Sequence, residues 1–370
     1  MLGMSEPQNS EVQGKSIEQK EVDDDLVVVE TKRARVVTVV REDNPQNAES
    51  EAEEDEDVED VEGDSVDFLE GFPDDTNELE LVHSRLNSLA NLRLPRFAAH
   101  LKKLCLRQNQ ISFLDPQIFR VLTNLEELDF YDNKIKTVGD ALNNLDKLTI
   151  LDLSFNLLKT IPETLEHLKS IDTIYFVQNK ISKIDGLQGI GATLRSLELG
   201  GNKIRKIENL DALVTLEELW LGKNKITKLE GLDTLKRLRV LSIQSNRITK
   251  IENLEHLESL EELYLSHNGV ERLEGLDKNL RLRTLDVASN FVPEIENISH
   301  LTQLEELWMS NNRIPKLQAL EPQLKHIATL ETIYLEGNPC QRVEGANYRR
   351  KIMIALPQVK QIDATYTRAA

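Results

Sequence analysis

The sequence predicts an α/β solenoid in which short parallel strands form a curved sheet on the concave face. Two observations predict it. A motif, L-x-x-L-x-L-x-x-N-x-I, recurs along most of the chain and is clearest at Leu216–Leu229, LEELWLGKNKITKL. Its period is almost constant. A short apolar motif at such a period is the signature of leucine-rich repeats. The repeat asparagines are Asn109, Asn133, Asn156, Asn179, Asn202, Asn224, Asn246, Asn268, Asn290, Asn312 and Asn338.

Each repeat has a simple physical logic. The leucine spacing places alternate side chains on opposite sides of a short strand. One repeat cannot bury its leucines alone, so neighbouring repeats stack and share one continuous core. The asparagine amide has both donors and an acceptor, so it can bond the backbone of adjacent turns where the chain leaves the strand. A repeat of mostly 22 residues is too short for a strand and a long helix. We therefore expect short 3₁₀ or single-turn segments on the convex side.

The array is expected to contain eleven to twelve repeats. The first, ELELVHSRLNSL ending at Leu89, is degenerate, with Ser84 in the asparagine position, and is expected to serve as the N-terminal cap. A solenoid also needs a terminal element over its open core. Residues 346–355 predict a capping helix that ends before Pro357. The predicted domains are an acidic tail (1–76), the repeats (77–338) and a C-terminal cap (339–370). With about eleven strands spaced ~4.8 Å apart, the concave arc should be about 50 Å long, wide enough for a folded domain.

The acidity of the chain belongs to its N-terminal segment. Residues 1–76 contain 25 acidic and six basic residues, which accounts for the whole net charge of −19. Low hydrophobicity with high like charge predicts disorder. Such a tail either keeps the protein soluble or binds a basic partner. One basic island, Thr31–Arg41, interrupts it: Lys32, Arg33 and Arg35 could act as a nuclear-localisation patch, or Val36–Val40 could add a strand to a partner's sheet.

Several function classes are disfavoured. The balanced repeat body lacks the clustered basic residues of a nucleic-acid site. Only two cysteines are present, which favours the cytosol or nucleus, and no apolar run reaches the ~18 residues that span a bilayer. No phosphate-binding loop, Cys-x-x-Cys or His-x-x-x-His occurs, and His256 and His300 merely share a repeat position. We therefore expect that the protein has no enzymatic activity, binds no cofactor, metal or nucleic acid, and does not associate with a membrane.

The outward strand positions carry the functional signal. The residue between the second and third leucine points into the concavity, and both tryptophans of the chain, Trp220 and Trp308, are there. This row could merely cover the sheet, since strands favour aromatic residues. Exposed tryptophans, however, are typical of binding hot spots. The row is Cys105, Asp129, Asp152, Tyr175, Glu198, Trp220, Ser242, Tyr264, Asp286, Trp308 and Tyr334. A second outward row, two positions earlier in each repeat, includes Glu306.

Several segments are distinctive beyond the generic repeat. They are the I-E-N-L and L-E-G-L connectors, LYLSHNGVERLEGL at 263–276, VASNFVPEIENISHLTQLEELWMS at 287–310, and the cap segment RRKIMIALPQVKQIDAT at 349–365. Over residues 77–370 the chain resembles the family of protein phosphatase 1 regulatory subunit 7, leucine-rich-repeat regulators of the type-1 serine/threonine phosphatase. An acidic N-terminal segment also fits this family.

The resemblance implies a regulatory subunit that binds the phosphatase catalytic subunit through its concave face and controls its activity or targeting. It further implies nuclear and cytoplasmic localisation, roles in the cell cycle and mitosis, and a further phosphatase inhibitor as a candidate third partner. At Tyr175 and Trp220 the resemblance implies that this chain carries a different aromatic residue from the aromatic residue of the family. The partner-binding residues carried over by position are Asp152, Tyr175, Glu198, Trp220, Asp286, Glu306, Trp308 and Tyr334.

Other hypotheses remain open at this stage. A basic-Val-x-Phe docking segment is missing, because Arg35–Val39 lacks the aromatic residue, so binding should depend on the curved face. The main alternative is a scaffold of the cytoskeleton or cilium with no phosphatase partner. An RNA-particle or histone-binding repeat protein is disfavoured, since such proteins have fewer repeats and an acidic run after them.

Overall fold

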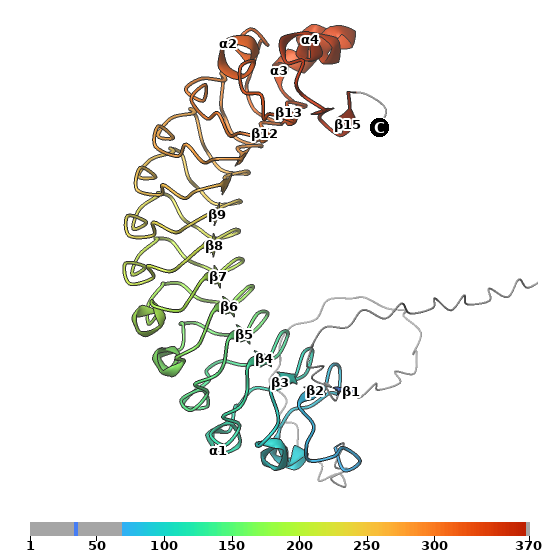
Figure 1. The fold of residues 1–370 in the computed structure, drawn as a ribbon, viewed down its shortest axis with the longest axis vertical. Helices are drawn as coiled ribbons and strands as arrows, with labels where there is room; N and C mark the ends of the chain where they lie inside the picture. Colours follow the sequence, from blue (N-terminus) through green and yellow to red (C-terminus); the bar gives the residue numbers. More distant parts are fainter. Residues whose placement is uncertain (1–32, 36–68, 368–370) are drawn as a thin grey trace, which may run out of the picture. The chain divides into compact units, whose positions relative to one another are not determined.

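The computed structural model describes residues 33–35 and 69–367, and these form one continuous sheet of fifteen strands in sequence order. Figure 1 shows the strands following one another along the inner side of an arc, with α1 and α2 on its outer side. The predicted solenoid of leucine-rich repeats is confirmed. The repeat strands are β2 (Glu78–Glu80), β3 (Lys103–Cys105), β4 (Glu127–Asp129), β5 (Ile150–Asp152), β6 (Thr173–Tyr175), β7 (Ser196–Glu198), β8 (Glu218–Trp220), β9 (Val240–Ser242), β10 (Glu262–Tyr264), β11 (Thr284–Asp286), β12 (Glu306–Trp308) and β13 (Thr332–Tyr334).

All neighbouring repeat strands are parallel and in the same register. Leu219 of β8 lies opposite Leu241 of β9, and Leu241 lies opposite Leu263 of β10. The middle residue of each strand points into the core, and these three leucines are fully buried. The first and third residues of each strand therefore face the concavity, as the leucine pattern predicts.

The convex side consists of turns and short helices, as expected from the length of the repeat. The longest convex segment has only five residues, because a 22-residue repeat leaves no room for more. Helix α1 begins after Asp115, whose carboxylate accepts a hydrogen bond from the Gln117 N–H at 2.8 Å. The convex segments are η1 (Ala90–Leu92), η2 (Leu94–Phe97), α1 (Pro116–Phe119), η3 (Glu163–His167), η4 (Gln188–Ile190) and α2 (Leu320–Leu324).

The repeat asparagines tie each repeat to the one before it. The Asn224 amide nitrogen donates to the carbonyls of Leu199 and Leu221 at 2.9 and 3.0 Å, and its oxygen accepts from the Ile204 N–H at 3.0 Å. The same pattern recurs from Asn109 to Asn338. These buried amides satisfy backbone groups that the short strands leave unpaired.

The connectors of the form I-E-N-L and L-E-G-L share one backbone conformation. Asn253, Gly275 and Asn297 have φ values of 58°, 71° and 56°. This left-handed region is open to glycine and is tolerated by asparagine. A Cβ on Gly275 would lie 2.4 Å from the Ile251 carbonyl oxygen, whereas the Asn297 side chain instead donates to the Leu273 carbonyl at 2.9 Å. Asparagine and glycine therefore alternate from one repeat to the next at this left-handed position.

The C-terminal cap contains α3 (Pro339–Glu344), η5 (Gly345–Asn347), α4 (Tyr348–Ala355), β14 (Gln361–Ile362) and β15 (Thr365–Tyr366). Helix α4 lies within the capping helix predicted at 346–355 and ends before Pro357, which confirms that prediction. The Tyr348 hydroxyl donates to Asp363 Oδ2 at 3.1 Å, and Asp363 Oδ1 accepts from the Leu335 N–H at 2.8 Å. This network joins the cap to the last repeat.

The N-terminal end differs from the expectation of a disordered tail up to residue 76. Arg33–Arg35 form strand β1, which pairs in parallel with β2 in the register Arg33–Glu78 and Arg35–Glu80. An open sheet edge offers unpaired backbone groups, which explains why a nearby strand can be added there. Leu69 is also fully buried in the core. The segment Val36–Val40, predicted to add a strand to a partner's sheet, lies outside the described residues.

Replacing Asn224 with alanine should destabilise the array. The substitution removes four hydrogen bonds and leaves buried backbone groups unpaired, which predicts a loss of about 2–3 kcal/mol. Denaturant unfolding of the whole chain measures this loss. Lys223→Ala, an exposed change in the same turn, serves as the control. A loss no larger than that of the control would contradict the structural role of the amide.

Replacing Gly275 with alanine should cost more stability than replacing it with asparagine. The added Cβ meets the Ile251 carbonyl in both variants, but Asn253 and Asn297 show that this position can adjust to an asparagine and gain a hydrogen bond. We expect about 1–2 kcal/mol for Gly275→Ala and less for Gly275→Asn. Thermal unfolding compares the two, with Gly200→Ala as the control because its nearest neighbour would be 3.5 Å away. Equal losses for the two variants would refute the explanation.

Candidate functional site: the concave face

Four aromatic rings form a continuous row on the concave face, which we call the aromatic ladder. Trp220 stacks on Tyr264 with ring centroids 6.3 Å apart and an interplanar angle of 20°. Tyr264 lies 6.2 Å from Trp308, and Trp308 lies 5.9 Å from Tyr334. All four side chains remain partly exposed. The ladder is therefore a large, rigid apolar surface of the kind that favours tight contacts.

The ladder depends on what lies between its strands. Trp220, Tyr264 and Trp308 come from alternate strands, and the strands between them carry Ser242 and Asp286 in the same position. Both of these residues are only 2% exposed. The rings of neighbouring ladder members thus approach one another across Ser242 and Asp286, which are small enough to lie beneath them.

A hydrogen-bond network forms the floor of the ladder. The Ser242 hydroxyl donates to Gln244 Oε1 at 2.9 Å, and Gln244 Nε2 donates to Asp286 Oδ2 at 3.4 Å. The other carboxylate oxygen of Asp286 accepts from the Ala288 N–H at 3.0 Å. Asp286 was predicted as a partner contact from its strand position. Its burial and its bonds instead suit a residue that supports the rings.

Tyr264 was part of the outward row but was not among the carried-over partner-binding residues. The structure places it at the centre of the ladder, where its hydroxyl donates to Glu262 Oε2 at 2.7 Å. Burial, and then the neighbouring Glu262 carboxylate, raise the pKa of this phenol, so Tyr264 remains a neutral donor. The sequence spacing indicates this position, because Tyr264 is 44 residues, or two repeats, from both Trp220 and Trp308.

Trp308 and Glu306 lie on the same strand, β12, and both side chains are partly exposed on the concave side. Among the described residues, the buried indole N–H of Trp308 has no hydrogen-bond partner. An unpaired buried donor costs free energy. The ladder is therefore not fully optimised for the protein on its own, which is common where a surface serves binding.

The predicted residues Asp152, Tyr175 and Glu198 lie on β5, β6 and β7, and Glu198 is the register partner of Trp220 at the end of the ladder. Asp152 Oδ1 accepts from the Ser154 N–H at 2.8 Å, and its Oδ2 lies 3.6 Å from Arg107 Nη2. Burial, followed by repulsion from Asp152, raises the pKa of Glu198. Burial and the Glu198 carboxylate likewise raise the pKa of Tyr175. These acids form an electronegative region that would be stabilised by a cationic group.

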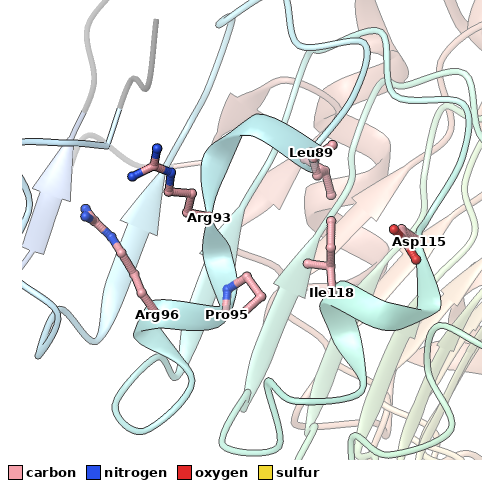
Figure 2. A pocket seen from close by; sticks show the side chains of 7 residues that line it. Leu89, Arg93, Pro95, Arg96, Asp115 and Ile118 are labelled. Carbon is pink, nitrogen blue, oxygen red and sulfur yellow. The ribbon is translucent and has the colours of Figure 1, made fainter. Parts of the chain in front are cut away.

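A shallow pocket near the N-terminal cap is an alternative candidate site. Figure 2 shows Arg93 and Arg96 on the opposite side of this pocket from Asp115, with a volume of about 590 Å³ between its walls. Arg96 donates to the Phe72 carbonyl at 3.0 Å, and Asp115 caps α1. These polar groups are engaged in local structure, so the pocket is a weak candidate.

Metal binding, membrane insertion and thiol reactivity each require a particular arrangement of residues. Within residues 33–35 and 69–367, no cluster of three or more His, Cys, Asp or Glu side chains is arranged to hold a metal ion. No helix in these ranges combines the length and apolar character needed to cross a bilayer. Cys105 and Cys340 are free thiols, and burial raises the pKa of Cys105 to about 11. Cys105 is therefore protonated and weakly nucleophilic at neutral pH.

Replacing Glu198 with glutamine should stabilise the protein at pH 7 and less so at pH 4. The folded-state pKa of Glu198 is raised, so its contribution to stability is greatest below its ordinary pKa and is lost as the pH rises through the folded value. Glutamine removes that loss. Thermal unfolding at the two pH values measures it, with exposed Glu258→Gln as the control. A gain of equal size at both pH values would argue against the electrostatic explanation.

Comparisons with known proteins agree with the repeat architecture. The family model described as "Leucine rich repeat" matches residues 99–158, and the one described as "Leucine Rich repeats (2 copies)" matches 192–234, 236–278 and 280–322. Among solved structures, a leucine-rich-repeat protein of Leptospira interrogans has a TM-score of 0.63 and 22% identity, covering 78% of this chain and 84% of that one. An internalin of Listeria monocytogenes has a TM-score of 0.60 and 23% identity, covering 79% of this chain and 87% of that one. Both show the fold alone.

Curated relatives point to one group of proteins. Protein phosphatase 1 regulatory subunit SDS22 of Saccharomyces cerevisiae is 47% identical over 86 residues, which are 23% of this chain and 25% of that protein. The protein phosphatase 1 regulatory inhibitor subunit PPP1R7 homolog of Arabidopsis thaliana is 37% identical over 156 residues, 41% of this chain and 46% of that protein. Protein phosphatase 1 regulatory subunit 7 of Bos taurus is 61% identical over 46 residues, 12% of each.

The matched segments span less than half the length of these relatives. The relatives are named as regulatory subunits, which supports the prediction that the chain is not an enzyme. The repeat architecture, the repeat-family matches and the consistent names of the relatives lead to one conclusion. The chain is a leucine-rich-repeat protein, and the relatives that it matches support the family of protein phosphatase 1 regulatory subunit 7.

Proposed function

We propose that this chain is a regulatory subunit that binds the catalytic subunit of a type-1 serine/threonine phosphatase through its concave face and controls its activity or targeting. The observation that carries the proposal is the aromatic ladder, which runs from β8 to β13 on the concave face. The names of the relatives supply the identity of the partner. We propose no catalytic step within this chain.

The geometry supports a folded partner rather than a short peptide. Five strand intervals separate Trp220 from Tyr334, so the ladder alone is roughly 24 Å long at ~4.8 Å per strand. Acidic side chains continue the face from the ladder towards β5, including Glu198 and Asp152. A partner that covers this face would bury rigid aromatic area at the centre and place basic groups opposite the acids.

The carried-over residues take different roles in this proposal. Trp220, Trp308 and Tyr334, with Tyr264, would supply the apolar contact. Asp152, Glu198 and Glu306 would meet basic groups, and Tyr175 would add an aromatic contact between β5 and β7. Asp286 would act from beneath by holding Gln244 and the rings in place.

The proposal also covers the localisation, the cellular role and a third partner of the protein. We propose nuclear and cytoplasmic localisation, a role in the cell cycle including mitosis, and a further phosphatase inhibitor as a third partner. A fluorescent fusion carrying Lys32, Arg33 and Arg35 changed to alanine tests the localisation. An unchanged nuclear share would show that these three residues are not the signal.

Replacing Trp220 or Trp308 with alanine should weaken binding to the catalytic subunit. Truncation of a hot-spot tryptophan costs about 2 kcal/mol or more, which corresponds to a roughly 30-fold higher Kd. Calorimetry with the purified full chain and the catalytic subunit measures the Kd, and a phosphatase assay on the same samples reports the effect on activity. Phe113→Ala is the control, since Phe113 is 65% exposed and lies between β3 and α1, outside the strands of the concave face.

Three outcomes would contradict the proposal. One is no binding by the natural chain. Another is an unchanged Kd for both tryptophan variants. The third is an equal loss for Phe113→Ala, which would place the contact elsewhere. Capture of tubulin or dynein components in place of the phosphatase would instead favour a cytoskeletal scaffold.

A further inference from the structure

Phe155 occupies a backbone position that does not suit its side chain. Each repeat has a left-handed residue just before its asparagine, and at Phe155 φ is 55°. Among the described non-glycine residues with positive φ, Phe155 is the only apolar one. It is also 40% exposed. The equivalent residues are Gln108, Asp132, Gln178, Gly201, Lys223, Ser245, His267, Ser289, Asn311 and Gly337. A bulky residue in this region is strained, and such strain is typical of functional positions.

The Phe155 ring belongs to a stack that crosses three repeats, which we call the platform: Arg107, Tyr131 and Phe155. The Phe155 and Tyr131 ring centroids are 4.8 Å apart with an interplanar angle of 45°. The Arg107 guanidinium lies 4.5 Å from the Tyr131 ring centroid. The three side chains therefore form a continuous stacked surface that ends in the exposed Phe155 ring.

Two carboxylates flank the platform. Arg107 Nε lies 3.0 Å from Asp129 Oδ2, and Arg107 Nη2 lies 3.6 Å from Asp152 Oδ2. One positive charge thus faces two negative charges. Burial, and to a lesser extent repulsion from Asp152, raise the pKa of Asp129 even with Arg107 beside it. A second cation at this place would relieve the excess negative charge.

The platform and the aromatic ladder share one sheet. Asp152 ends β5, and Trp220 ends β8, three strands further along. The separation is about 14 Å at ~4.8 Å per strand, within reach of one folded partner. Between them lie Tyr175 and Glu198, which continue the aromatic and acidic character of the face.

We infer that the platform is a second contact site that binds a lysine or arginine side chain of the same partner that covers the aromatic ladder. The cationic head would lie against the face of Phe155, with Asp152 as its counter-ion. The exposed ring supplies the cation–π surface and the unbalanced carboxylate supplies the charge. This inference rests on the proposed function, because it assigns a further part of the same partner's footprint.

The test compares Phe155→Asn and Phe155→Leu with the natural chain in binding to the purified catalytic subunit of type-1 phosphatase. Asparagine suits the left-handed conformation, and Asn311 holds the equivalent position, so Phe155→Asn should keep its Tm within about 2 °C or raise it. Leucine keeps apolar bulk and removes the ring face. We expect each variant to raise the Kd about fivefold, as for loss of one cation–π contact. Phe113→Asn, the same change at an exposed phenylalanine between β3 and α1, should leave the Kd unchanged.

The outcomes separate this inference from the proposed function. If the natural chain does not bind the catalytic subunit, both are overturned. If it binds, and Trp220→Ala weakens binding while Phe155→Asn and Phe155→Leu do not, only the platform is overturned. If Phe155→Leu retains full affinity while Phe155→Asn loses both affinity and several degrees of Tm, the ring supports the fold and does not bind a cation.

Discussion

The side-chain amide at the end of each strand is the interaction on which the rest of the structure depends. Each strand has only three residues, too few to hold a sheet together through its own hydrogen bonds. The asparagine amides bond the backbone of the preceding repeat and of their own repeat, so successive turns cannot shift relative to one another. The leucines supply the free energy of burial, but they would tolerate small displacements. The amides fix the register.

Because all repeat strands pair in the same register, the position of a residue within its repeat decides where it lies on the concave face. Residues two repeats apart lie two strands apart in the same column, which brings Trp220, Tyr264 and Trp308 together. Contact between their rings then requires a small or buried residue on each intervening strand. Ser242 and Asp286 meet this requirement, and Gln244 bonds both. The aromatic ladder therefore depends on the alternation of large rings with small or buried residues as much as on its aromatic content.

The repeats, the three-residue strands, the role of the asparagines and the capping helix were predictable because each follows from a local, recurring pattern. The outward row was also predictable, since strand alternation decides which side chains leave the core. Alternation does not state how far a ring leans across a neighbouring strand. For that reason the sequence does not show that Asp286 lies beneath the rings or that Tyr264 lies at the centre of the ladder. The backbone conformation of Phe155 and the pairing of β1 with β2 depend on neighbours that the local pattern does not include.

The placement of the two tryptophans has an optical consequence. The chain has no others, and both are members of the aromatic ladder on the concave side. Its ultraviolet emission is therefore dominated by chromophores at that surface, with tyrosines close enough to transfer excitation energy to them. Covering the surface would change the polarity around the indole rings and shift their emission without any attached label. The protein carries its own spectroscopic reporter of whether its concave face is occupied.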